Sequence, residues 1–232
     1  MTNQTKKGNL YLVSTPIGNM SDITLRALEI LKQSDLVAAE DTRRSGMLLK
    51  HFNIKNQLES YHDHNKAQKT PLLIKKLRQG TDIALISDAG TPGISDPAFY
   101  LVREAVKNNI RIIPIPGPSA ALAALTASGL ATDRFVFEGF LPAKKKRKKK
   151  LEYIAQETAT IILYESPHRL IRTLEDLHEF CGDRRMAVCR ELTKKFEEIV
   201  RGTLTEVKEN FSQRKNIKGE CVLIMEGAEK KK

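Results

Sequence analysis

The sequence predicts a soluble α/β protein of two domains. Short β-rich runs alternate with helical patterns along the chain, which is typical of mostly parallel sheets covered by helices. The 232 residues suffice for two compact domains. A hydrophobic fraction of 41% and a charged fraction of 29% exclude a disordered or fibrous chain. We expect the domains to span residues 1–114 and 118–232, because the proline-rich segment 114–118 resembles a stiff hinge.

The first domain begins with an apolar run at 9–15 that predicts a buried strand. A helix is expected at 21–33, where Ser21 or Asp22 can cap the first turn. The remaining expected elements are a strand at 36–39, a helix at 66–78, a strand at 82–87, a helix at 97–108 and a strand at 111–115. This alternation predicts a mostly parallel sheet with helices on both faces.

The second domain is richer in strands, which favours a mixed α+β arrangement. Helices are expected at 119–128, 151–156 and 170–180, and Gly182 follows the last of these. The expected strands lie at 135–140, 160–165, 186–190, 198–201 and 220–225.

Charge is concentrated in one place. The net charge is +11, and almost all of it comes from the run Lys144–Lys150 and the three residues Lys230–Lys232. Such a run either forms a solvated loop or docks on a phosphate backbone, and its length favours RNA. The absence of Trp and an aromatic fraction of 6% disfavour a base-stacking platform.

Several other site classes are disfavoured. The three cysteines form no CxxC pair, and the five histidines, including the pair in His62-Asp63-His64, lack zinc-site spacing, so we expect no metal. The uncharged run 112–132 is interrupted by prolines and glycines, so it does not predict a membrane span. We therefore expect a cytoplasmic protein.

Polar loops follow four of the predicted strands. They are Ser14–Met20, Ala39–Arg44, Ser87–Pro97 and Tyr164–Arg169. Ligands of open α/β sheets bind at the carboxyl ends of strands, so these loops predict a ligand site. The alternative interpretation is that Ser and Asp here only cap the following helices. Neither a dinucleotide-binding glycine motif nor a P-loop is present.

Five segments in this order resemble one known family. They are Asn9–Asn19, Ala39–Arg43, Ser87–Pro97, Pro116–Ala120 and Tyr164–Arg169. Together they resemble the 16S rRNA 2′-O-ribose methyltransferases of the tetrapyrrole methylase superfamily. The resemblance covers nearly the whole chain and implies two α/β domains with S-adenosylmethionine in a cleft between them. It also implies a cytidine ribose of 16S rRNA in the 30S subunit as substrate, and a homodimer.

The resemblance also implies positions for the site. The expected cofactor contacts are Pro16, Ser87, Asp88, Ala89, Gly90, Ile94, Ser95, Ser119, Ala120, Tyr164 and Leu192. Corrinoid-type relatives carry Gly-Gly-Asp-Pro where this chain has Ser87-Asp88-Ala89-Gly90, which weakens a tetrapyrrole substrate.

Methylation of a hydroxyl requires a base within hydrogen-bond reach. The candidates are Glu40, Asp41 and Asp88, with Glu165 behind them, and Glu40 or Asp41 is preferred. Arg43 and Arg44 are expected to hold phosphates, and Lys144, Lys145, Lys146, Arg147, Lys148, Lys149 and Lys150 to dock rRNA. Two alternatives remain open: a small-molecule tetrapyrrole-type methyltransferase, and a non-enzymatic RNA-binding assembly factor.

Overall fold

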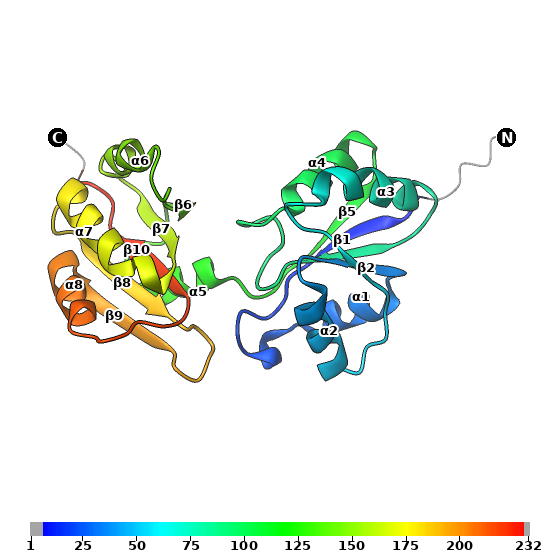
Figure 1. Cartoon of the computed structure of the whole chain (residues 1–232), viewed down its shortest axis with the longest axis horizontal. Helices are drawn as coiled ribbons and strands as arrows, with labels where there is room; N and C mark the ends of the chain where they lie inside the picture. Colours follow the sequence, from blue (N-terminus) through cyan, green and yellow to red (C-terminus); the bar gives the residue numbers. More distant parts are fainter. Residues whose placement is uncertain (1–6, 230–232) are drawn as a thin grey trace. The chain divides into compact units, whose positions relative to one another are not determined.

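The computed structural model describes residues 7–229 and divides into two compact units, Met1–Ser119 and Ala120–Lys232 (Figure 1). The units join directly after the proline-rich segment discussed above. Lys230–Lys232, which carry part of the net charge, lie outside the described residues. Each unit is built around its own five-stranded sheet.

The first unit contains a fully parallel sheet. Its strands are β1 (Asn9–Val13), β2 (Leu36–Ala39), β3 (Leu58–Ser60), β4 (Ile83–Ile86) and β5 (Arg111–Ile115), in the order β3-β2-β4-β1-β5. All four residues of β2 and of β4 are buried, as expected for strands covered on both faces.

Helices cover both faces of this sheet. They are α1 (Leu25–Gln33), α2 (Thr42–His51), α3 (Lys66–Arg78) and α4 (Ala98–Lys107), and a 3-10 turn, η1 (Met20–Asp22), precedes α1. Helices α3 and α4 pack on one face in a cluster with Leu10 and Leu85. Helices α1 and α2 pack on the other face with Val13 and Ile86. The predicted parallel α/β sheet is therefore observed.

The structure corrects two details of the first unit. Helix α1 begins at Leu25 because the Thr24 hydroxyl accepts a hydrogen bond from the Ala27 amide (3.1 Å), whereas Ser21 lies in η1. Helix α2 and strand β3 were not predicted from the sequence.

The second unit contains a mixed sheet. Its strands are β6 (Phe135–Phe140), β7 (Thr160–Glu165), β8 (Arg185–Arg190), β9 (Glu198–Thr203) and β10 (Cys221–Met225), in the order β6-β7-β10-β8-β9. Only β6 and β7 pair in parallel, and the other three pairs are antiparallel. The mixed arrangement agrees with the α+β expectation for this half.

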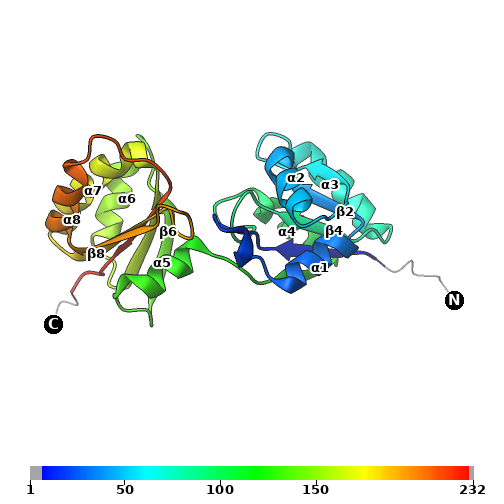
Figure 2. The same ribbon diagram turned by 90° about the horizontal axis from the view of Figure 1, so that it is seen from below.

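The helices of the second unit are α5 (Ala120–Ser128), α6 (Arg147–Ile154), α7 (Leu170–Cys181) and α8 (Leu204–Ser212), with a 3-10 turn η2 (Pro167–Arg169) before α7. Helices α6, α7 and α8 share one apolar cluster against the sheet. Helix α5 lies on the opposite face, as Figure 2 shows, and the Ala124 carbonyl lies 3.9 Å from the Cys189 sulfur of β8. Among residues 7–229, we find no helix with the length and apolar character needed to span a membrane.

Two helices of this unit differ from expectation. Helix α6 starts at Arg147 rather than at 151, because Lys146 turns the chain with a φ of 66°. Helix α8 was not predicted, although Thr203 and Glu206 form a capping box at its start.

Candidate active site

The carboxyl ends of all five parallel strands lie at one edge of the first unit's sheet, which we call the carboxyl edge. Three of the four polar loops predicted from the sequence leave from this edge, after β1, β2 and β4. The fourth, Tyr164–Arg169, follows β7 of the second unit. A parallel sheet therefore brings together segments that are far apart in the sequence.

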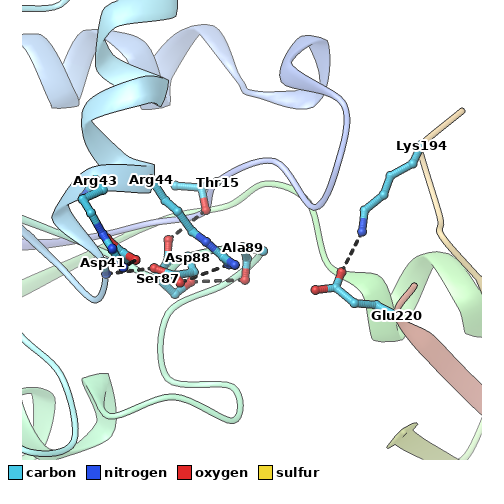
Figure 3. Close-up of polar contacts among 9 residues, drawn as sticks. All are labelled: Thr15, Asp41, Arg43, Arg44, Ser87, Asp88, Ala89, Lys194 and Glu220. Atoms are coloured by element: carbon cyan, nitrogen blue, oxygen red, sulfur yellow. Dashed lines mark hydrogen bonds and ion pairs between the residues drawn. The ribbon is translucent and has the colours of Figure 1, made fainter. Parts of the chain in front are cut away.

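Hydrogen bonds tie the β1 and β4 loops together. Thr15 and Gly90 form an isolated antiparallel bridge, with N–H to O distances of 2.9 and 3.0 Å. The Thr15 hydroxyl also donates to the Ser87 carbonyl at 3.2 Å (Figure 3). Gly90 has a φ of +80°, a conformation that favours glycine. The backbone of Ser87–Gly90 is thus held in one place.

The β5 loop joins the same arrangement. Ser14 donates to the Thr91 hydroxyl at 3.1 Å, and Thr91 donates to the Pro118 carbonyl at 3.3 Å. A Cβ on Gly117 would lie 2.9 Å from the Ser14 Cβ, so only glycine fits this close approach. Ser119, an expected cofactor contact, directly follows this loop and is half-buried.

Asp88 links the β4 loop to α2. Its Oδ1 accepts from the Asp41 amide at 2.9 Å, and its Oδ2 accepts from the Arg44 guanidinium at 3.2 Å (Figure 3). Both carboxylate oxygens already accept hydrogen bonds, so Asp88 holds the β4 loop and the start of α2 together. Ala89, beside it, is exposed.

Asp41 caps α2 and is paired with Arg43. Its carboxylate accepts from the Arg43 amide (2.8 Å) and from the Arg43 guanidinium (3.1 and 2.8 Å). These Arg43 hydrogen bonds hold the pKa of Asp41 well below its usual range. A carboxylate with so low a pKa is a poor proton acceptor, and Arg43 is engaged with it rather than free.

Glu40 has the opposite electrostatics. Its side chain is half-buried, and burial, followed by the negative charges of Asp88, Asp96 and Asp63, raises its pKa. A carboxylate with a raised pKa is a better base than an ordinary one. Of the predicted candidates, Glu40 is therefore the one whose environment suits proton abstraction. Glu165, the last of them, is buried in the second unit and accepts a hydrogen bond from Thr173.

Asp96 closes the long β4 loop. Its carboxylate accepts from the amides of Gly93 and Ala98, each at 2.8 Å, and burial raises its pKa. Ser95 adopts a φ of 66°, a strained conformation for a residue other than glycine. Ile94 and Ser95, two expected cofactor contacts, are exposed on this loop, and Pro16 on the β1 loop is half-buried.

Three expected cofactor contacts lie in the second unit. Ala120 begins α5. Tyr164 is the second-last residue of β7. Its ring packs edge-on against Phe137 and Phe140, with centroid distances of 5.0 and 5.7 Å. Burial raises the pKa of its hydroxyl. Leu192 is 8% exposed and follows β8.

The loop that carries Leu192 is tightly constrained. Its neighbours Glu191 and Thr193 have φ values of 53° and 66°. Lys194 bridges Glu191 (2.8 Å) and Glu220 (2.9 Å), and the second of these pairs is drawn in Figure 3. These contacts fix the chain around Leu192 within the second unit.

The basic run does not act as one surface. Lys144, Lys145, Lys146, Lys148 and Lys149 are exposed, as an RNA-docking role requires. Lys150 pairs with Glu138 and lies 5.1 Å from the Tyr153 ring centroid. Arg147 departs from the expected role, because it is 5% exposed and does not present its charge to a partner.

Arg147 instead belongs to a buried polar network. Its guanidinium donates to Asp176 (2.6 Å), to the Thr173 hydroxyl (2.9 Å) and to a backbone carbonyl at Pro142. Thr173 in turn donates to Glu165 at 2.6 Å. The pattern of the sequence gave no sign of this network, since nothing distinguishes Arg147 from its lysine neighbours except its residue type.

Most of the chain matches the model of a known protein family. Residues 9–208 match the family model of the tetrapyrrole (corrin/porphyrin) methylases. The chain belongs to the tetrapyrrole methylase family. The predicted family and α/β fold are thereby confirmed, and the chain is a methyltransferase.

Relatives of high identity carry one name. A protein of Haemophilus influenzae named ribosomal RNA small subunit methyltransferase I is 55% identical over 96% of this chain and 80% of its own length. Proteins of the same name from Synechocystis sp. and Escherichia coli O157:H7 are 55% and 53% identical over 95% of this chain, and 80% and 78% of their own lengths are covered.

Solved structures share the fold at low identity. Uroporphyrin-III C-methyltransferase of Thermus thermophilus, solved with S-adenosylhomocysteine, has a TM-score of 0.65 at 19% identity, covering 94% of this chain and 97% of that one. Diphthine synthase has a TM-score of 0.72 at 14% identity, covering 94% and 90%. These structures establish the fold of the chain.

Proposed function

We propose that the protein transfers a methyl group from S-adenosylmethionine to the 2′-hydroxyl of a cytidine ribose in the 16S rRNA of the small ribosomal subunit. The relatives at 53–55% identity, all named for small-subunit rRNA, support the substrate class. The observation that carries the chemistry is Glu40, a half-buried carboxylate with a raised pKa at the carboxyl edge.

The residues of the carboxyl edge fit the expected cofactor. S-adenosylmethionine carries a sulfonium and an ammonium, and the carboxylates of Glu40, Asp88 and Asp96 at this edge favour a cation. The constrained Ser87–Gly90 backbone, with Ala89 exposed, offers peptide groups at strand ends. We expect Pro16, Ser87–Gly90, Ile94, Ser95, Ser119, Ala120, Tyr164 and Leu192 to hold it.

When bound, S-adenosylmethionine supplies a methyl carbon that is electrophilic because it is attached to a sulfonium. Glu40 would accept the proton of the 2′-hydroxyl, which converts a poor nucleophile into a good one. As the new oxygen–carbon bond forms, the bond between the methyl carbon and the sulfur would break, and S-adenosylhomocysteine would leave. Asp88 holds the Asp41 amide and Arg44, and so keeps the Glu40 backbone in register with the β4 loop. Arg44, which is exposed, retains donors for a substrate phosphate.

The exposed lysines Lys144–Lys146, Lys148 and Lys149 dock the rRNA. Each phosphate that they neutralise adds affinity that salt weakens and that is independent of sequence. A tetrapyrrole methyltransferase has no need of such a surface, which is why we favour the rRNA substrate. We also expect the protein to be cytoplasmic and to form a homodimer. Sedimentation at micromolar concentration would test the homodimer.

The decisive experiment compares Glu40→Gln with Asp41→Asn. Small subunits lacking the modification would receive radiolabelled S-adenosylmethionine under single-turnover conditions, with the label mapped to the nucleotide. Loss of the base in Glu40→Gln should lower the rate by about 10²–10⁴-fold. Asp41→Asn should lower it by less than about tenfold, because a cap contributes only ~1 kcal/mol. Equal rates for both variants and the unaltered protein would refute the role of Glu40. Transfer to a tetrapyrrole but not to small subunits or naked 16S rRNA would refute the substrate.

A further inference from the structure

A cavity lies at the carboxyl edge between the first turns of α3 and α4, two helices that pack side by side on one face of the sheet (Figure 1). Its volume is about 260 Å³. Cavities that hold whole drug-sized ligands have volumes of about 300–1,000 Å³, so this one suits a single ring system. The lining includes two carboxylates, a lysine, a hydroxyl and two aromatic rings: Asp63, Asp96, Lys66, Ser95, Phe99 and Tyr100.

Phe99 presents an aromatic ring to this cavity and to solvent. It is 64% exposed, although it is a large apolar residue. The neighbouring Tyr100 ring is already covered by the Arg103 guanidinium, whose carbon lies 4.8 Å from the ring centroid. A nucleobase stacks on such an exposed ring, and the stacking is independent of which base it is. The low aromatic content of the chain disfavours a platform for several bases, but one base needs only one ring.

The cavity lies beside the proposed base. In the order β3-β2-β4, Glu40 follows the middle strand, so it leaves the sheet between the loop that carries Asp63 and the loop that carries Asp96. The three carboxylates are close enough that the charges of Asp96 and Asp63 raise the pKa of Glu40. A nucleoside whose base occupies the cavity therefore has its ribose near Glu40.

The hydrogen bonds of the two lining carboxylates differ. Both oxygens of Asp96 accept from the Gly93 amide, and one also accepts from the Ala98 amide. Asp63 is 67% exposed and accepts from Lys66 Nζ through Oδ1 alone, at 2.6 Å, so its Oδ2 is available to a ligand.

A carboxylate distinguishes between bases by their exocyclic groups. It accepts a hydrogen bond from the N4 amino group of cytosine, whereas uracil carries an oxygen at the same position. The oxygen is an acceptor, so a carboxylate cannot bond to it and repels it. The acidic lining therefore favours a base with an amino group over uracil.

We propose that this cavity binds the base of the target nucleotide, with the Phe99 ring stacked on the base and Asp63 accepting from its exocyclic amino group. The ribose then lies at Glu40. This inference rests on the proposed function and adds to it the residues that select cytosine.

The first test replaces the aromatic ring. Phe99→Leu keeps an apolar side chain but loses the stacking face, and Phe99→Tyr keeps that face. Val106→Ala is the control, because Val106 is a 61% exposed apolar residue of the same helix outside the cavity. The readouts are kcat/KM for methylation of small subunits, S-adenosylmethionine affinity by calorimetry and the thermal midpoint.

We expect Phe99→Leu to lower kcat/KM by about tenfold, which corresponds to about 1.4 kcal/mol and lies within the range for stacking of one base. Phe99→Tyr and Val106→Ala should stay within about threefold of the unaltered protein. Cofactor affinity and thermal midpoint should be the same in all of them, because Phe99 is exposed in the free protein.

The second test changes the base. Small subunits reconstituted with uridine in place of the target cytidine would be compared with cytidine subunits. The unaltered protein should prefer cytidine, and Asp63→Asn should reduce that preference by about tenfold, because the Asn amide can donate to the uracil oxygen. Lys66→Gln is the matched control: it breaks the same ion pair but keeps the Asp63 acceptor, so the preference should persist.

Equal kcat/KM for Phe99→Leu and Phe99→Tyr, or an unchanged base preference in Asp63→Asn, would overturn the inference. A fall in S-adenosylmethionine affinity in Phe99→Leu would also overturn it, because that result assigns the cavity to the cofactor, of which Ser95 is an expected contact. Failure of the unaltered protein to methylate cytidine subunits would instead refute the proposed function, so the two failures are distinguishable.

Discussion

Replacing Arg147 by alanine separates the structural role of this residue from the docking role of its neighbours. The Arg147 side chain is 6% exposed and its partner Asp176 is 23% exposed, so the substitution leaves a carboxylate that is still in contact with water. Breaking a fully buried ion pair lowers stability by about 3–5 kcal/mol. The exposure of Asp176 places Arg147→Ala at the lower end, at about 3 kcal/mol.

The rest of the network limits the damage. Thr173 keeps its bond to Glu165 in this variant, whereas the Pro142 carbonyl loses the Arg147 donor. A loss of about 3 kcal/mol in a unit of this size lowers the thermal midpoint by roughly 10 °C.

The matched control is Lys148→Ala, because Lys148 is the next residue and is exposed. Its stability should stay within about 0.5 kcal/mol of the unaltered protein. Its affinity for small-subunit rRNA should fall, with a weaker salt dependence. Calorimetric unfolding and filter binding at several salt concentrations measure both quantities. The reasoning is refuted if Arg147→Ala unfolds at the same temperature as Lys148→Ala.

Three further perturbations test the charges described above. Substituting Lys144, Lys145, Lys148 and Lys149 by Gln should reduce the slope of log affinity against log salt by up to about 3 for single-stranded RNA, with S-adenosylmethionine affinity unchanged in calorimetry. Glu40→Gln should stabilise the protein at pH 7 but not at pH 4. Because the pKa of Glu40 is raised in the folded state, ionised Glu40 opposes folding above that pKa, and the effect is absent below the pKa of the unfolded state, near 4.5. Urea unfolding should therefore show a higher free energy of unfolding only at pH 7. Glu198→Gln should behave in the opposite way, because hydrogen bonds from Arg214, and then from Arg190, lower the pKa of Glu198 to about 2. Ionised Glu198 stabilises the fold above pH 4.5, and this stabilisation disappears as the pH falls toward 2. The variant should therefore be less stable than the unaltered protein at pH 7 and equally stable near pH 2.

The sequence predicted most of the fold because its strands have strong local signals. The buried runs at β4 and β7 are four and six residues of almost uniformly apolar or β-branched type. Short elements without such runs were missed. Strand β3 has three half-buried residues, and α2 begins with Thr-Arg-Arg, so neither shows a clear apolar period. Tertiary pairing rather than local preference forms them.

The sequence predicted that the candidate residues gather at one edge of the sheet, but not the environment of each. The parallel alternation put Glu40, Asp41 and Asp88 at one edge, since strand ends gather there. The identity of the base could not be predicted from the sequence, because Glu40 and Asp41 are adjacent carboxylates. Their pKa values differ in direction through Arg43 on one side and burial on the other, and both depend on three-dimensional neighbours. The burial of the Arg147 side chain could not be predicted from the sequence either, because its partner Asp176 is 29 residues away.

The strand orders have a consequence for how the chain is made. In the second unit, β10 lies between β7 and β8, so the last strand in the sequence joins the two halves of the sheet. In the first unit, the first strand, β1, lies between β4 and β5. Domains generally fold in order of synthesis, and long-range strand pairing is slow. During translation, about a hundred residues are therefore synthesised after β1 before its partner strand β5 can complete the sheet. In the second unit, β7 and β8 cannot be joined into one sheet until Cys221–Met225 has left the ribosome.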